Sequence, residues 1–323
     1  MTRIPVFDMM KGIAILFMII GHCQIPDSLH RIIYLFHLPL FFIVSGYFYK
    51  NNSLKPQLVK DLKRLVVPYF LCAFVVGIKY GIDAFRLHDF SKIPDFCLAV
   101  IWGSCPIQIE DFSLPDIGPI WFLLALFWCR QIFNWIMTYK SGPIFVISIA
   151  LFSTLLSQFV IFPWSILQGM SGMLFYLMGF LFAHHQNSRH TLLPLSVLII
   201  PIAYFYGAID MHTGLYPNFT MNVLGALAAS YLLYVFLDFI SQIHFLRSSM
   251  SWLGEWSLLI LGVHYIEFML INWNAKISFW METCEEPVVW VIGIRILSII
   301  ASVFFLSRIS FIKQIFVGGA KTK

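Results

Sequence analysis

The chain has 323 residues, of which 59% are hydrophobic and only 11% are charged, and its mean hydropathy is +0.82. Soluble domains carry about 25% charged residues, so this composition excludes a soluble globular protein and predicts one that crosses a membrane several times. The net charge of +5 does not indicate nucleic acid as a partner, because membrane proteins gather Lys and Arg in their cytoplasmic loops.

Membrane-spanning helices need about 20 mostly apolar residues. We expect such helices at 9–26, 29–49, 65–83, 118–138, 143–162, 168–184, 192–207, 220–240, 251–273 and 287–308. The stretch 96–107 is too short to span and is interpreted as an interfacial segment. The fold class predicted is therefore all-α, a polytopic membrane bundle of about ten transmembrane helices. We expect residues 1–323 to form one membrane-embedded domain.

The distribution of basic residues predicts the orientation of this bundle. With the N-terminus in the cytoplasm, six of the 21 basic residues fall in outer segments or outer halves of helices, which leaves 15 on the cytoplasmic side. The six are Arg31, Lys79, Arg86, Lys92, Lys276 and Arg295. The bias has the sign of the positive-inside rule, so both termini are predicted to be cytoplasmic.

The first apolar run carries two ionisable residues, Lys11 and His22, at either end of the stretch GIAILFMIIG. They are separated by about three helical turns, so they lie on one face with an axial separation of about 16 Å. Asp8 precedes Lys11 by three residues and shares this face. Ionisable residues within a membrane are candidates for function. The alternative is that Lys11 reaches the interface and His22 only caps the helix end.

Later helices carry further ionisable residues. The second run contains His37 two residues before Pro39, which frees a backbone carbonyl inside the membrane. In the ninth run His264 and Glu267 share a face, and Arg295 of the tenth run lies at a similar depth. We expect Glu267 and Arg295 either to form a structural ion pair or, with His264, to bind substrate. A metal site is not expected, because a third and a fourth ligand are not evident.

Several familiar enzyme patterns are missing from the sequence. It contains neither the GxSxG nucleophile motif nor the glycine patterns of Walker and Rossmann sites, so no tightly bound cofactor is expected. Among six cysteines there is no CxxC pair. Cys97 and Cys105 share one predicted loop, where they form either a disulfide or two free thiols.

Four segments resemble the membrane acyltransferase-3 family, in the order that the family has them. They are RIPVFDMMKGIAILFMIIGH (3–22), FHLPLFFIVSGYFY (36–49), GPIWFLLALF (118–127) and SWLGEWSLLILGVH (251–264). The chain is most similar to fucose 4-O-acetylase-like sugar O-acetyltransferases. One departure is Lys11, which stands where arginine is commoner in the family and which gives up bidentate contact with phosphate.

The resemblance implies an O-acyltransferase with about ten helices, in which Lys11 and His22 are the key pair. It implies transfer of an acyl group, by default acetyl from cytoplasmic acetyl-CoA, to a hydroxyl of an extracytoplasmic cell-envelope glycan or lipid-linked sugar. The expected location is the bacterial inner (plasma) membrane.

We hypothesise that His22 acts as general base or carries the acyl group, and that Lys11 engages the anionic end of coenzyme A. His37 would orient His22 or polarise the thioester carbonyl. One alternative is a proton-coupled transporter of a polysaccharide or small molecule, with His22, His37, Glu267 and Arg295 as a proton relay. A second is a non-catalytic partner in an envelope-assembly complex.

Overall fold

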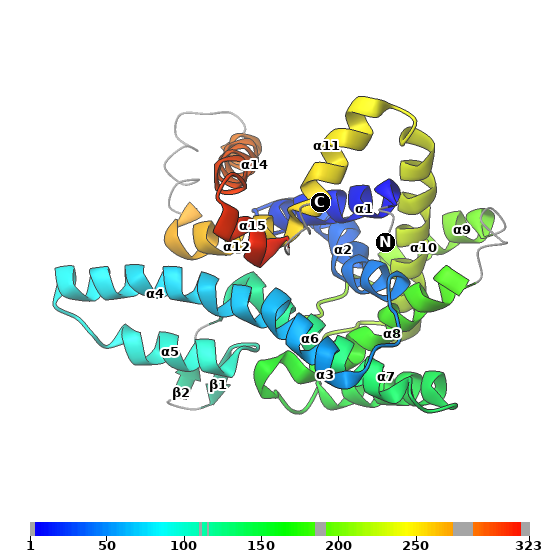
Figure 1. Ribbon diagram of the computed structural model, residues 1–323, viewed down its shortest axis with the longest axis horizontal. Helices are drawn as coiled ribbons and strands as arrows, with labels where there is room; N and C mark the ends of the chain where they lie inside the picture. Colours follow the sequence, from blue (N-terminus) through cyan, green and yellow to red (C-terminus); the bar gives the residue numbers. More distant parts are fainter. Residues whose placement is uncertain (1–3, 110–111, 115, 185–191, 274–286, 318–323) are drawn as a thin grey trace.

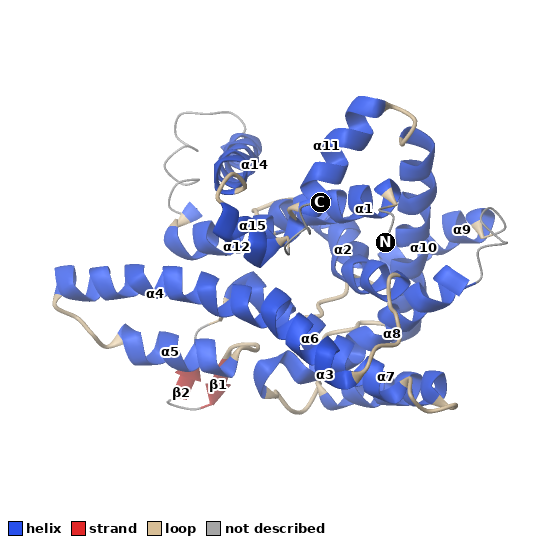
Figure 2. Cartoon of the chain, in the orientation of Figure 1, coloured by secondary structure: helices blue, strands red, loops and turns tan. Residues whose placement is uncertain are grey.

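A computed structural model describes residues 4–109, 112–114, 116–184, 192–273 and 287–317. In chain order its helices are α1 (Pro5–Gly21), α2 (Asp27–Tyr47), α3 (Leu54–Asp61), α4 (Val67–Leu87), α5 (Lys92–Trp102), α6 (Trp121–Ile136), α7 (Gly142–Leu156), α8 (Ile166–His184), α9 (Leu193–Phe205), α10 (Phe219–Ile240), α11 (His244–Glu255), α12 (Ser257–Leu270), α14 (Pro287–Leu306) and α15 (Ser310–Phe316) (Figure 1). The strands β1 (Ile107–Ile109) and β2 (Phe112–Leu114) form one small antiparallel pair (Figure 2). The predicted helical fold is thus confirmed for the described residues, apart from this short pair of strands.

Not every predicted span is long enough to cross a membrane by itself. Six helices in the described ranges are long and apolar enough, and a seventh span results if the bent pair α11 and α12 is counted as one. The helices α1, α7 and α9 have 17, 15 and 13 residues, and α5 has 11. The predicted interfacial segment 96–107 thus overlaps the second half of the short helix α5.

Two predicted spans have different bounds in the structure. The span predicted at 65–83 belongs to a continuous helical segment, Leu54–Leu87, because charged residues such as Lys55 and Lys60 favour a helix as much as apolar ones do. A π-helical turn, Leu62–Val66, joins α3 to α4. The span predicted at 251–273 is not one straight helix, since α11 and α12 meet at an angle of 64°.

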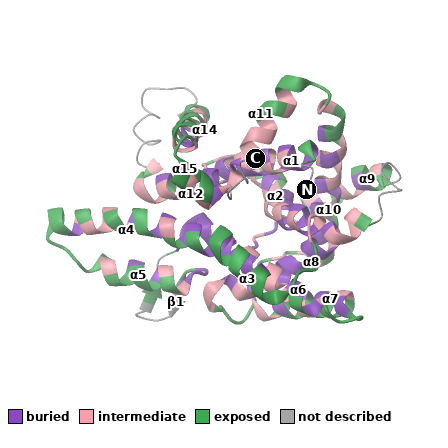
Figure 3. Ribbon diagram, viewed as in Figure 1, coloured by how far each residue is buried: buried purple, intermediate pink, exposed green. Residues whose placement is uncertain are grey.

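Glycines allow the helices around α1 and α2 to approach closely. Gly12 of α1 and Gly254 of α11 each face the other helix's backbone, and Gly46 of α2 and Gly179 of α8 do the same. Small residues at crossings are typical of membrane helices. The outer surfaces of α4, α7 and α14 expose large apolar side chains, among them Phe85, which suits contact with lipid (Figure 3).

The crossing of α1 and α11 makes a testable prediction about stability. A Cβ at Gly254 would overlap the backbone oxygen of Asp8, so Gly254→Ala should push the helices apart and cost about 1–3 kcal/mol. We expect a lower thermal unfolding midpoint in detergent. Gly293 of α14 is the control, because a Cβ there meets nothing within 4 Å. Gly293→Ala should leave the midpoint unchanged or raise it, and an equal loss in both variants would contradict the prediction.

Candidate active site

One face of α1 runs along two cavities in the centre of the bundle. Lys11 and Ile15 line the first cavity, His22 lines the second, and Met18 lines both. Their spacings of four, three and four residues keep all of them on one side of a helix. The helix face that was predicted to carry Lys11 and His22 therefore runs from one cavity to a second one. We name these the basic cavity and the histidine cavity.

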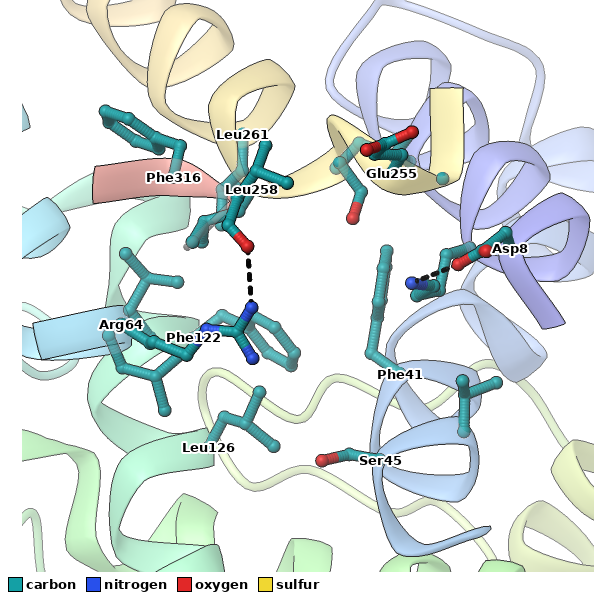
Figure 4. Close-up of a pocket in the computed structure, with 18 of the residues that line it drawn as sticks. Asp8, Phe41, Ser45, Arg64, Phe122, Leu126, Glu255, Leu258, Leu261 and Phe316 are labelled. Atoms are coloured by element: carbon teal, nitrogen blue, oxygen red, sulfur yellow. Dashed lines mark hydrogen bonds and ion pairs between the residues drawn. The ribbon is translucent and has the colours of Figure 1, made fainter. Parts of the chain in front are cut away.

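The basic cavity has a volume of 360 Å³ and is enclosed by α1, α2, α6, the α3–α4 segment, the bend between α11 and α12, and the end of α15. Three cations line it, Lys11, Arg64 and Arg130, together with the carboxylates of Asp8, Asp61 and Glu255. Lys11 lies 2.7 Å from the carboxylate of Asp8, and Arg64 donates a hydrogen bond to the main-chain oxygen of Val317. Figure 4 shows Arg64 on the wall opposite Asp8. The two cationic groups thus flank the cavity from different helices.

The third cation belongs to a buried polar network. Arg130 of α6 lies 3.1 Å from Asp61 and donates to the hydroxyl of Ser45 at 3.0 Å. Gln57 and Gln131 donate to the other oxygen of Asp61, which satisfies this buried carboxylate. The π-helical turn begins one residue later, and such turns are frequent at functional sites.

The histidine cavity has a volume of 210 Å³. Its described lining residues are Met18, His22, Tyr34, His37, Leu38, Asp116, Gly118, Pro119, Trp121, Asp210, His212 and Phe268. Met18 and Leu38 line both cavities, so these two side chains form the partition between them.

A chain of polar contacts runs behind His22. Its Nδ1 lies 3.0 Å from Nε2 of His264, Nδ1 of His264 lies 3.3 Å from the carboxylate of Glu267, and Glu267 accepts two hydrogen bonds from Arg295 at 2.9 and 3.1 Å. Arg295 also donates to the main-chain oxygen of His22 at 3.0 Å. The structure therefore joins four of the predicted site residues in one network.

The network favours one proton position on each imidazole. Nδ1 of His264 lies 3.3 Å from the carboxylate of Glu267 without forming an aligned hydrogen bond, and the negative charge there favours the tautomer with the proton on Nδ1 and the lone pair on Nε2. Nδ1 of His22 must then be the donor to His264, which leaves the lone pair of His22 on Nε2. His22 lines the histidine cavity, and the arrangement suits a base or a nucleophile there.

His37 has a separate anchor. Its Nδ1 donates to the main-chain oxygen of Ile33 at 2.7 Å, so a neutral His37 has its lone pair on Nε2. A lone pair cannot polarise a carbonyl, so that predicted role requires a doubly protonated ring. Among the described residues no hydrogen bond joins His37 to His22, although both line the same cavity.

Sequence reasoning missed several residues that line the cavities. Arg64 and Arg130 were counted only as cytoplasmic charges, and Asp61 lay outside the predicted helix. Asp210 and His212 lie in the connection between α9 and α10, where a single sequence gives no sign that they face His22. Of the two alternatives left open for Cys97 and Cys105, the structure has the free thiols, with Cys97 exposed and Cys105 buried.

Comparison with known proteins gives a family for this arrangement. Residues 4–307 match the acyltransferase domain that defines the acyltransferase-3 family. The chain belongs to the acyltransferase-3 family. The resemblance seen in four sequence segments is confirmed by a match over nearly the whole chain.

Among curated proteins, the chain is similar to a nodulation protein, NolL, of Mesorhizobium japonicum. It is 26% identical over 193 residues, which cover 55% of this chain. The matched region spans 47% of the length of that relative, about half. No solved structure is significantly similar to this acyltransferase-3 chain.

Proposed function

We propose that the protein is an integral membrane O-acyltransferase. It moves an acetyl group from cytoplasmic acetyl-CoA to a hydroxyl of an extracytoplasmic cell-envelope glycan or lipid-linked sugar. The observation that carries the proposal is the face of α1 from Lys11 to His22, which links a cavity with three cations to a cavity with histidines. Family membership supports the reaction class.

The donor occupies the basic cavity. Coenzyme A is an anion with several phosphate charges and a long, thin arm that ends in the thioester. Lys11 and Arg64, which both line this cavity, hold the phosphate charges of coenzyme A. The arm passes between Met18 and Leu38, along the roughly 16 Å that separate Lys11 from His22 on the helix axis. The acetyl group then lies beside His22.

The acceptor enters from the histidine cavity. Nε2 of His22 takes the proton of the acceptor hydroxyl while the hydroxyl oxygen attacks the thioester carbon. The carbon–sulfur bond breaks, and the sulfur leaves with the bonding electrons and takes that proton from His22. The products are an O-acetyl ester and free coenzyme A. While His22 holds this proton it is positively charged, and Glu267 stabilises that charge through His264.

This mechanism needs the two cavities to open on opposite sides of the membrane. We propose ten spans, in which α1, α7 and α9 cross as short helices beside the six long ones and the bent pair. Both termini and the basic cavity then face the cytoplasm. The chain forms one membrane-embedded domain in the bacterial inner (plasma) membrane.

The direct test uses purified protein in nanodiscs with radiolabelled acetyl-CoA and acceptor-containing envelope fractions. We expect release of coenzyme A together with label in a glycan. No release by a folded sample, with acceptors present, would overturn the proposal.

A variant of Lys11 tests the placement of the donor. Lys11→Met keeps the length of the side chain but removes its charge, so the KM for acetyl-CoA should rise about tenfold or more, since hydrogen bonds to charged groups contribute about 1.5–3 kcal/mol. The turnover number should fall less. Lys140→Met is the control, because Lys140 lies exposed between α6 and α7. A KM that stays at the wild-type value in Lys11→Met would contradict the donor site.

A second function has one observation in its favour. The contacts from His22 through His264 to Glu267 also suit a proton relay in a proton-coupled transporter. Such a protein would move its substrate in vesicles in response to a proton gradient and without acetyl-CoA. Flux under those conditions would favour the transporter over the acyltransferase.

A further inference from the structure

Two carboxylates line the histidine cavity. Asp116 precedes α6, Asp210 lies in the connection between α9 and α10, and both line the cavity with His212 and Trp121. No lysine or arginine is among the described residues that line it. The basic cavity, in contrast, is lined by three cations together with the carboxylates of Asp8, Asp61 and Glu255. An anion in the histidine cavity therefore meets two carboxylates and no lysine or arginine, and Nε2 of His212 lies 3.5 Å from Asp116.

Both carboxylates are held by the backbone of their own loops. Asp116 accepts a hydrogen bond from the backbone N–H of Gly118 at 2.8 Å. Asp210 accepts from the backbone N–H of His212 at 3.0 Å and from the hydroxyl of Thr213 at 2.7 Å. A carboxylate has about four acceptor positions, so each group keeps capacity for a hydroxyl of a bound molecule.

The loop that carries Asp210 is fixed in place. The main-chain oxygen of His212 accepts from Gln168 at 2.9 Å and from the thiol of Cys105. Burial raises the pKa of the Cys105 thiol to about 12, so it remains a donor at neutral pH. The ring of His212 stacks on Trp121, with ring centroids 5.1 Å apart and planes 23° apart. The part of the cavity lined by Asp210, His212 and Trp121 is therefore preorganised before any acceptor binds.

We propose that Asp116, Asp210 and the His212–Trp121 stack form the acceptor subsite and select a neutral or amino sugar over an acidic one. The proposal rests on the proposed acyl transfer and names the chemistry of its acceptor. The carboxylates accept hydrogen bonds from ring hydroxyls and repel a carboxylate or phosphate carried by the same ring. They also keep the phosphates of the donor out of this cavity.

The test compares sugars that differ in one group. Purified protein in nanodiscs receives acetyl-CoA and, in turn, the methyl glycosides of glucose, galactose and mannose and of the three matching uronic acids. A methyl glucosaminide is added as a cationic probe. Release of coenzyme A without any sugar is measured first, because it reports the donor reaction by itself. We expect kcat/KM for at least one neutral or amino sugar to exceed that for its uronic acid tenfold or more.

The variants Asp210→Asn and Asp116→Asn remove the charge and keep an oxygen for the same backbone N–H groups. Each should raise the KM for the favoured sugar and reduce the discrimination against its uronic acid about tenfold. The shift in discrimination is a readout that a loosened loop would not produce. Asp89→Asn is the control, because Asp89 lies exposed in the loop after α4 and does not line the cavity.

The possible outcomes distinguish failure of the proposed acceptor subsite from failure of the proposed acyltransferase function. Uronic acids that match or exceed the neutral sugars would overturn the inference, and so would release of coenzyme A that no neutral or amino sugar stimulates. Discrimination that is unchanged in both Asn variants would overturn it as well. Absence of any release would refute the acyltransferase function itself, and the acceptor subsite with it.

Discussion

Replacing His22 with alanine is expected to lower the rate of acyl transfer at least a hundredfold. A positioned general base contributes about 10²–10⁴ in rate, and loss of a covalent acyl carrier would cost more. In the structure His264 cannot replace the lone pair of His22 Nε2, because His264 uses its own Nε2 to accept from His22. The measurement is single-turnover release of coenzyme A with saturating acceptor.

The matched control is His244→Ala, since His244 is exposed at the start of α11 and lies outside both cavities. It should keep the wild-type rate. Both variants should insert into membranes and elute as folded protein. Full activity in His22→Ala would refute the mechanism. Trapped label on wild-type protein, absent from His22→Ala, would identify His22 as the acyl carrier, and its absence from both would favour the general base.

Arg295→Met is expected to destabilise the protein by about 3–5 kcal/mol. Arg295 is 1% exposed and forms two hydrogen bonds with Glu267, which is 8% exposed. Removing the cation leaves the carboxylate buried without its partner, and breaking a buried pair in this way carries a cost of that size. The thermal unfolding midpoint in detergent should fall accordingly.

The double variant Glu267→Gln/Arg295→Met provides the control. Without either charge, no uncompensated ion is buried, so much of the lost stability should return. Activity should not return, because His264 then lacks the carboxylate that fixes the proton on its Nδ1. A double variant that is as unstable as the single one would contradict this account of the pair.

Much of the fold could be predicted from the sequence, because hydropathy alone fixes where a chain enters lipid. A helix overlaps each of the ten predicted positions, but only six of the described helices, or seven spans with the bent pair counted as one, are long and apolar enough to cross a membrane. The predicted helix bounds were wrong where the apolar pattern does not determine how far a helix extends or whether it bends. Charged residues such as Lys60 continue a helix that was expected to begin at residue 65, and nothing in the composition distinguishes a straight span from the bend between α11 and α12.

The candidate site was predictable only within single helices. The common face of Lys11 and His22, and that of His264 and Glu267, follow from helical periodicity. The contact between His22 and His264 joins residues 242 positions apart. Helical periodicity relates only residues of the same helix, so it does not predict this contact. The same limit explains why Asp210 and His212 were not among the predicted residues, although they share a cavity with His22.

The partition formed by Met18 and Leu38 has an electrical consequence. Water that fills both cavities would thin the insulating layer from the roughly 30 Å of a hydrocarbon core to about the width of these two side chains. The membrane voltage, about 2.3 kcal/mol per elementary charge at 100 mV, would then fall mainly across this short segment. His22 lies one helical turn from it, so proton movements at His22 would take place at the edge of the strongest part of that field.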